Sequence, residues 1–166
     1  LMTQKRIFLI GMMGCGKSTL GPLLAKQFDL PFLDIDALIE QREGRSISQI
    51  FKEQGERHFR QLEQQELNEL PDVPQIVACG GGLPCFEDNM LRLKLKGLVI
   101  YLEAAPEVLY ARIQNEMDRP LLQGWPAFEQ LFLVREACYR GADVIINANS
   151  EPVQLLRELE QMLGLK

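Results

Sequence analysis

The residues Gly11-Met-Met-Gly-Cys-Gly16-Lys17-Ser18 match the pattern G-x-x-x-x-G-K-[ST]. A short apolar run at residues 5–10 precedes them and indicates a buried strand, and residues 18–28 show the apolar spacing of an amphipathic helix. Glycines let a backbone curl so that several N–H groups point at one phosphate group, and a helix start adds partial positive charge. The stretch therefore predicts a phosphate-binding loop between a strand and a helix.

The loop also carries the side chains that nucleotide chemistry needs. Lys17 can reach the β- and γ-phosphates, and the Ser18 hydroxyl can ligate Mg²⁺. Because the motif and its position agree, nucleotide binding is favoured over a glycine-rich turn without a ligand. We interpret Cys15 as a small tolerated residue, not as a nucleophile. The loop residues expected to bind ATP are Gly14, Cys15, Gly16, Lys17, Ser18 and Thr19.

Short apolar runs alternate with helical spacing along the rest of the chain. The runs lie at residues 31–33, 75–79, 98–102 and 144–146. Alternation of this kind is typical of βαβ units and of a parallel sheet covered on both faces. The sequence thus predicts one α/β domain over residues 1–166 with a five-stranded parallel sheet, and ligands beyond the carboxyl ends of its strands.

Three local signals predict helix boundaries. Ser46-Ile-Ser-Gln49 has the form of a capping box, Gly55 is expected to interrupt the helix that follows it, and Ser150 is expected to cap the last helix.

Composition limits the classes of partner and compartment. The net charge of −5 argues against a nucleic-acid or anionic-membrane surface, and no apolar run approaches the ~18 residues of a membrane span. The four cysteines show no C-x-x-C spacing, which favours reduced thiols in the cytoplasm over a zinc site or a disulfide framework. We expect a cytoplasmic monomer.

The class of phosphate-loop protein follows from what else the sequence contains. The strings Asn-Lys-x-Asp and Asp-x-x-Gly of GTPases do not occur, nor does an apolar run ending in Asp-Glu. A small-molecule or nucleotide kinase remains, in which the protein mostly positions the reactants and neutralises charge.

Asp34-Ile-Asp36 follows the second predicted strand. Residues two apart in an extended segment point the same way, so both carboxylates could face one site. One could hold a Mg²⁺-bound water, and the other could accept or orient a hydroxyl proton. The alternative interpretation is a helix cap followed by an exposed aspartate.

Two further segments contain candidate ligand-binding groups. Gly80-Gly-Gly82 follows the third predicted strand, where three glycines permit a ligand to approach the backbone closely. Arg119-Pro-Leu-Leu122 lies between two predicted helices and could close over ATP as a lid, so that Arg119 stabilises the transferring phosphoryl group.

Taken in order, these motifs resemble those of the shikimate kinase family over nearly the whole chain. The resemblance implies an α/β fold of the nucleoside-monophosphate-kinase-like P-loop type, a three-layer sandwich. The matching motifs beyond the phosphate loop are Asp34-Ile-Asp36, Gly44-Arg-Ser-Ile47, Phe59-Arg60-Gln-Leu-Glu63, Gly80-Gly-Gly82, Arg119-Pro-Leu-Leu122 and Arg135-Glu-Ala-Cys-Tyr139.

The resemblance implies transfer of the γ-phosphoryl group of ATP to the 3-hydroxyl of shikimate, with Mg²⁺ as cofactor. It implies that Lys17, Asp36 and Arg119 are catalytic and that Arg112 stacks on adenine. Asp34 would act on the metal through water, beside Ser18. The implied shikimate-binding residues are Asp36, Arg60, Gly81, Gly82, Arg135, Phe51 and Phe59.

The resemblance also implies that two segments move, and two alternative functions stay open. A substrate-binding helical segment at about residues 36–62 and a lid at about 112–126 are expected to close, because phosphoryl transfer must exclude water. Cys79 stands where many members have Ser or Thr, and the lid contains Trp125. The rival hypotheses are another small P-loop kinase, such as a gluconate or nucleoside monophosphate kinase, and a non-catalytic nucleotide-binding module.

Overall fold

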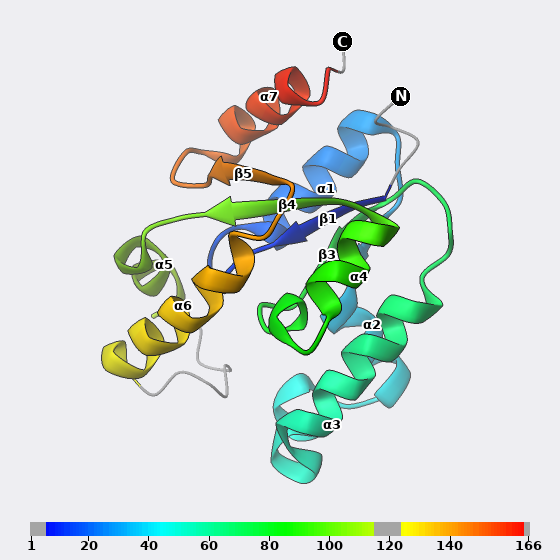
Figure 1. The fold of residues 1–166 in the computed structure, drawn as a ribbon, viewed down its shortest axis with the longest axis vertical. Helices are drawn as coiled ribbons and strands as arrows, with labels where there is room; N and C mark the ends of the chain where they lie inside the picture. Colours follow the sequence, from blue (N-terminus) through cyan, green and yellow to red (C-terminus); the bar gives the residue numbers. More distant parts are fainter. Residues whose placement is uncertain (1–5, 115–123, 165–166) are drawn as a thin grey trace.

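The computed structural model describes residues 6–114 and 124–164, which form strands alternating with helices (Figure 1). The elements, in chain order, are β1 (Arg6–Ile10), α1 (Lys17–Phe28), β2 (Phe32–Asp34), α2 (Ile35–Glu43), α3 (Ile47–Glu69), β3 (Ile76–Ala78), the 3₁₀ helix η2 (Leu83–Cys85), α4 (Asn89–Lys96), β4 (Gly97–Glu103), α5 (Pro106–Ile113), α6 (Trp125–Tyr139), β5 (Val144–Asn147) and α7 (Pro152–Met162).

The strands form one five-stranded sheet in the order β2-β3-β1-β4-β5. Every neighbouring pair is parallel, so the predicted five-stranded parallel sheet is confirmed. β1 lies in the middle, with Leu9 opposite Ala78 of β3 and Ile100 of β4. All five residues of β1 are buried, as expected for a strand with a layer of helices on each face.

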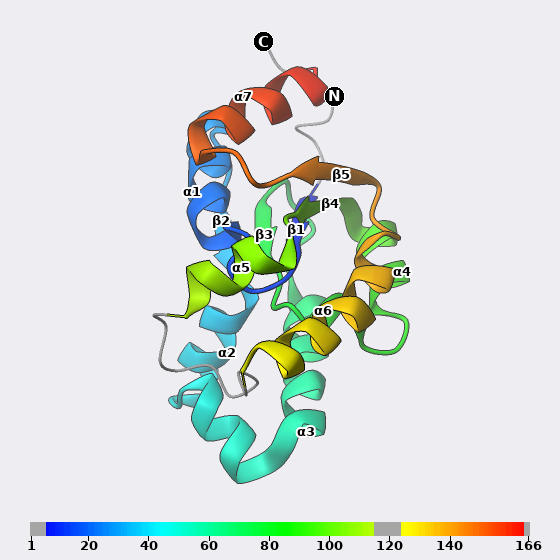
Figure 2. The same ribbon diagram turned by 90° about the vertical axis from the view of Figure 1, so that its left-hand side faces the viewer.

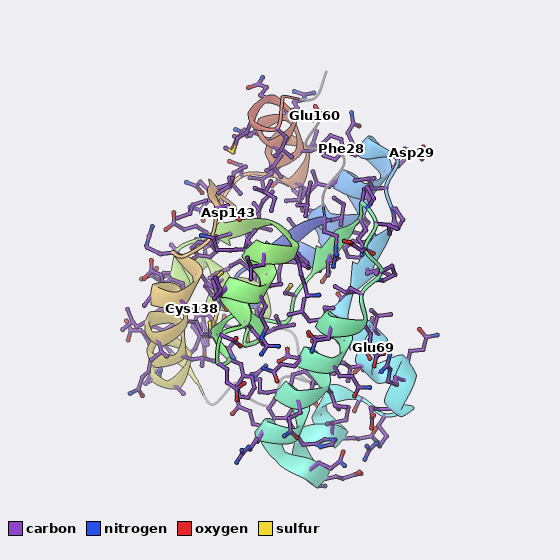
Figure 3. The ribbon with its side chains drawn as sticks, turned by 45° about the vertical axis from the view of Figure 1, so that its right-hand side comes forward. Phe28, Asp29, Glu69, Cys138, Asp143 and Glu160 are labelled. Carbon is purple, nitrogen blue, oxygen red and sulfur yellow. The ribbon has the colours of Figure 1, made fainter. Side chains whose placement is uncertain are left out.

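Helices form the outer layers of the sandwich. α1 and α7 pack together on one face of the sheet, and α4 and α6 lie on the other (Figure 2). α2 and α3 pack on each other and lie at the opposite end of the molecule from α7. Side chains fill the spaces between these layers (Figure 3). None of the described helices is long and apolar enough to cross a membrane.

The helix boundaries test the local predictions. The capping box at Ser46 is confirmed, because its hydroxyl accepts the backbone N–H of Gln49, whose side chain accepts the N–H of Ser46. Gly55 interrupts α3 as predicted, with φ of 81°. The prediction that Ser150 caps the last helix is wrong. The cap position of α7 is Glu151, no side chain bonds the helix start, and Pro152 supplies the first helical residue, which needs no N–H partner.

Candidate active site

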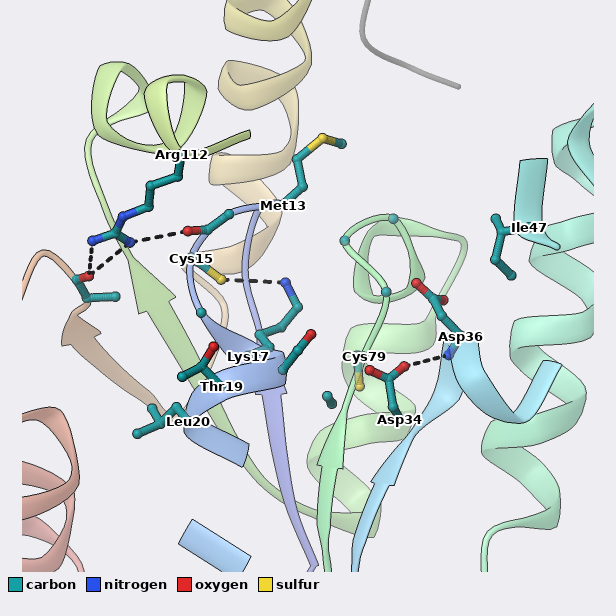
Figure 4. A pocket seen from close by; sticks show the side chains of 18 of the residues that line it. Met13, Cys15, Lys17, Thr19, Leu20, Asp34, Asp36, Ile47, Cys79 and Arg112 are labelled. Carbon is teal, nitrogen blue, oxygen red and sulfur yellow. Dashed lines mark hydrogen bonds between the residues drawn. The ribbon is translucent and has the colours of Figure 1, made fainter. Parts of the chain in front are cut away.

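A cavity of about 830 Å³ opens at the carboxyl ends of the strands (Figure 4). Every predicted site residue within the described ranges lines it, and Arg119 lies outside those ranges, as do residues 115–123 of the expected lid. The predicted residues in the cavity wall are Gly14, Cys15, Gly16, Lys17, Ser18, Thr19, Asp34, Asp36, Phe51, Phe59, Arg60, Gly81, Gly82, Arg112 and Arg135.

The phosphate loop forms one end of this cavity. Gly16 has φ of 98°, a left-handed conformation that a glycine adopts without strain, and Lys17 begins α1 directly after it. The Lys17 ammonium donates to the carbonyl of Gly11 at 2.7 Å and lies 3.5 Å from the sulfur of Cys15 (Figure 4). The ammonium can exchange these contacts for phosphate oxygens, so the loop has the form that nucleotide binding requires.

Arg112 connects two parts of the same end of the cavity. Its guanidinium donates to the carbonyl of Gly14 at 3.2 Å and to the carbonyl of Ala148 at 3.3 Å. Gly14 belongs to the phosphate loop and Ala148 follows β5, so the arginine spans the wall between them (Figure 4).

Asp34 and Asp36 both line the cavity, but they do not lie in one extended segment as predicted. α2 begins at Ile35, so Asp34 and Asp36 are not two positions of one extended segment. The Asp34 carboxylate accepts the backbone N–H groups of Asp36 at 2.9 Å and Ala37 at 3.3 Å, which makes it the helix cap. Asp36 lies in the first turn and faces the cavity (Figure 4). The cap interpretation is therefore correct for Asp34, and both carboxylates still share one site.

The carboxylates of Asp36 and Glu63 both lie next to Gly80. A Cβ atom on Gly80 would stand 2.7 Å from Oδ1 of Asp36 and 2.6 Å from Oε1 of Glu63. Among the described residues, neither of these two oxygens has a hydrogen-bond partner. Burial, followed by the charge of Asp34, raises the pKa of Asp36 to about 6. Burial also raises the pKa of Glu63 to about 7, against the opposing charge of Arg60.

Glu63 is a site residue that sequence reasoning missed. It ends one of the family motifs, but no role was predicted for it. It is 0% exposed and pairs with Arg60 at 2.6 Å. A signal was present, because a carboxylate three residues after an arginine lies beside it on a helix, and this one falls among the buried positions of α3.

Two buried arginines border the glycine segment. Arg60 is 6% exposed and also pairs with Glu56 at 3.0 Å. A Cβ atom on Gly82 would stand 2.1 Å from Nη2 of Arg60, and one on Gly81 would stand 3.0 Å from Nη1 of Arg135. The glycines thus make room for the protein's own charged groups, whereas the sequence predicted only room for a ligand.

Arg135 differs from Arg60 in its partners. It is 5% exposed, and its hydrogen bond within the described residues is a weak one to the sulfur of Met12 at 3.9 Å. A buried guanidinium with little pairing is suited to an anionic ligand. Phe51 and Phe59 complete this end with an apolar wall, their ring centroids 4.8 Å apart.

Comparison with known proteins gives the same result over most of the chain. The family model described as "Shikimate kinase" matches residues 13–163. The shikimate kinase of Synechococcus sp. (strain JA-3-3Ab) is 45% identical over 164 residues, covering 95% of this chain and 86% of the relative. That of Sulfurihydrogenibium sp. (strain YO3AOP1) is 40% identical over 159 residues, covering 94% and 96%.

This chain belongs to the shikimate kinase family. It is accordingly an ATP-dependent kinase, as the phosphate loop and the motifs that follow it predicted.

Solved structures agree with the family assignment. The shikimate kinase of Acinetobacter baumannii, solved in complex with shikimate, superimposes with a TM-score of 0.90 at 35% identity, covering 98% of this chain and 95% of that one. A gluconokinase from Sinorhizobium meliloti 1021 superimposes with a TM-score of 0.61 at 15% identity, covering 99% and 94%. The second likeness is one of fold alone, so it does not support the gluconate kinase alternative.

Cys79 is buried directly after β3 and lines the cavity. Burial raises the pKa of its thiol far above the usual range, so the side chain stays a neutral thiol.

Proposed function

We propose that this chain transfers the γ-phosphoryl group of ATP to the 3-hydroxyl of shikimate, giving shikimate 3-phosphate and ADP. The observation that supports this best is one cavity with two chemically different ends. A phosphate loop forms one end, and the half-buried carboxylate of Asp36 with two buried arginines forms the other. The acceptor site of a hydroxylated acid needs a carboxylate that binds the hydroxyls and arginines that bind the acid group.

At the acceptor end, Arg60 and Arg135 hold the shikimate carboxylate, since guanidinium groups donate two parallel hydrogen bonds to a carboxylate. Asp36 binds the substrate hydroxyls and accepts the proton of the attacking one. Its pKa of about 6 leaves it ionised at neutral pH, yet basic enough to assist removal of that proton. Backbone groups of Gly81 and Gly82 and the rings of Phe51 and Phe59 complete the pocket.

At the donor end, residues 14–19 surround the phosphates, and Lys17 stabilises the negative charge that develops on the transferred group. Arg112 stacks on the adenine ring from its place beside Ala148. Arg119, outside the described residues, is proposed to act with Lys17.

The proposed metal is Mg²⁺. Ser18 and Asp34 offer a hydroxyl and a carboxylate in the cavity wall beside Lys17, and hard oxygen ligands suit this ion. Within residues 6–114 and 124–164 no group of three or more metal-ligating His, Cys, Asp and Glu side chains occurs. That fits an ion held mainly by substrate phosphates and water. When bound, Mg²⁺ neutralises phosphate charge. Asp34 would act on it through water.

We also propose a single domain over residues 1–166 that acts as a monomer in the cytoplasm, where the four cysteines would stay reduced thiols. Its substrate-binding segment spans about residues 36–62 and its lid about residues 112–126. The net charge of −5 supports the absence of nucleic-acid and membrane partners.

A coupled ADP-release assay tests the proposal. MgATP is supplied with shikimate, gluconate, AMP or CMP, and the wild type is compared with Asp36→Asn. ADP release with shikimate alone, lost in the variant, is the expected result. Release with another acceptor would overturn the proposed substrate. Binding of ATP without turnover of any acceptor would favour the non-catalytic module.

A further inference from the structure

Tyr139 is a buried residue that contacts the glycine segment Gly80–Gly82 from outside the cavity. It is 0% exposed, and its hydroxyl donates to the carbonyl oxygen of Gly81 at 2.6 Å. Tyr139 does not line the cavity, and neither the proposed catalysis nor the proposed substrate contacts use it.

We propose that Tyr139 is a positioning residue for the acceptor substrate. By bonding Gly81, it fixes the glycine segment against α6, so that the backbone of the segment and the guanidinium of Arg135 form one preset surface. The inference rests on the proposed function, because that function makes this surface the shikimate site.

The hydrogen bonds of the segment show why a side chain is needed there. The carbonyl of Gly80 accepts the N–H of Leu83 at 3.1 Å, and the carbonyl of Gly82 accepts the N–H of Cys85 at 3.1 Å. The Gly81 carbonyl lies between these two and is bonded by the tyrosine hydroxyl. Three consecutive glycines have no side chains that could restrict the backbone themselves. Tyr139 therefore supplies the restraint at the middle peptide.

The same turn of α6 connects this restraint to Arg135. Tyr139 follows Arg135 by four residues, so the two side chains project from the same face of the helix. A Cβ atom on Gly81 would stand 3.0 Å from Nη1 of Arg135 and 3.3 Å from the hydroxyl of Tyr139. Both side chains thus approach one peptide.

A second contact supports this arrangement. The Cys85 thiol lies 3.9 Å from the backbone carbonyl of Arg135, which joins η2 to the same helix turn. The helix turn from Arg135 to Tyr139 therefore contacts both ends of the segment 81–85. A movement of the glycines would change their position relative to Arg135.

The chemistry of the phenol suits a constant restraint. Burial raises the pKa of Tyr139 well above its usual value, so the hydroxyl stays protonated and remains a donor at any pH at which the enzyme is assayed. Loss of the hydroxyl would leave the Gly81 carbonyl without this partner and the middle peptide free to rotate.

The test compares Tyr139→Phe with Tyr101→Phe. Phenylalanine fills nearly the same volume, so the first variant removes the hydroxyl and little else. Tyr101 is the matched control, because it is a buried tyrosine whose ring centroid lies 5.1 Å from that of Tyr139 and whose hydroxyl does not bond the glycine segment. KM and kcat are measured for each substrate, and the Kd of shikimate is measured by calorimetry without ATP.

We expect Tyr139→Phe to raise the KM and Kd of shikimate about fivefold to tenfold, as the loss of one hydrogen bond predicts. The KM of ATP should stay within about twofold of the wild type, and Tyr101→Phe should change neither. Hydrogen exchange should become faster at residues 80–85 in Tyr139→Phe and stay unchanged in the control.

Other results would overturn the inference. A Tyr139→Phe variant that melts at a lower temperature but keeps the wild-type KM and Kd of shikimate would show that the residue only stabilises the core. Equal rises in the KM of both substrates would show general loosening. Failure of the wild type to phosphorylate shikimate would instead refute the proposed function, so the two failures are distinguishable.

Discussion

Replacement of Asp36 by asparagine should inactivate the protein and stabilise it at the same time. The charge of this half-buried carboxylate is costly, because its Oδ1 atom is buried and the described residues leave that oxygen unbonded. An amide of the same shape lacks that charge. We therefore expect activity to fall by about 10²- to 10⁴-fold, the usual contribution of a general base, while resistance to urea rises at alkaline pH.

The magnitude follows from the pKa. Folding raises the pKa of Asp36 from 3.8 to about 6, and each unit corresponds to about 1.4 kcal/mol. Since the folded state binds the proton more tightly than the unfolded state, stability is greatest below about pH 4 and falls as the pH rises through about 6. Above both values the ionised group costs about 3 kcal/mol. The asparagine variant should gain up to this amount at pH 8 and almost nothing at pH 4.

Urea unfolding at pH 4, 6 and 8 without ligands measures this difference. The exposed Glu129→Gln on α6 is the control, because it also removes one negative charge but leaves the buried site intact. A variant that is less stable than the wild type at pH 8 would refute the reasoning. So would a gain in stability that is the same at all three pH values.

Three further outcomes follow from the site. Arg60→Lys, which loses the planar fork that pairs with carboxylates, should raise the KM of shikimate about 10- to 100-fold and leave the KM of ATP within about twofold in steady-state kinetics. Gly82→Ala places a methyl group 2.1 Å from Nη2 of Arg60, so urea unfolding should show a loss of about 1–3 kcal/mol, and calorimetry should show weaker shikimate binding. A wild-type affinity in that variant would show that Arg60 does not bind the substrate. Removal of divalent cations with EDTA should abolish ADP release, and added Mg²⁺ should restore it, whereas turnover in EDTA would refute the proposed metal.

The sequence predicted the elements that have strong local signals. The five strands are short apolar runs between helical patterns, and the break at Gly55 needs a left-handed conformation that glycine readily adopts. α2 was predicted only as part of the helical segment at about residues 36–62, with its start read as extended, and α4 was not predicted. The first turn of α2 contains Asp36 and follows a strand directly, so its residues could be mistaken for a continued extended segment. α4 has only eight residues, too few for a clear periodic pattern.

The candidate site was predicted as a set of residues but not as a set of contacts. The positions of Lys17 and Asp36 after predicted strands placed them at one end of the sheet, and the family resemblance added Arg60 and Arg135. All four line one cavity. The burial of Glu63 depends on how α3 packs over Gly80, which no local pattern encodes. The bond from Tyr139 to Gly81 joins segments 58 residues apart, and such a contact becomes visible only in the folded chain.

The central place of β1 in the sheet has a consequence for how the chain folds as it leaves the ribosome. β1 and the phosphate loop precede β3 and β4 in the chain, but β1 has to pair with both of these later strands. Until Gly97–Glu103 has emerged, the strand that anchors the loop lacks one of its two neighbours. The phosphate loop is therefore synthesised well before the strand that completes its support, and the nascent chain exposes the apolar β1 in the interval.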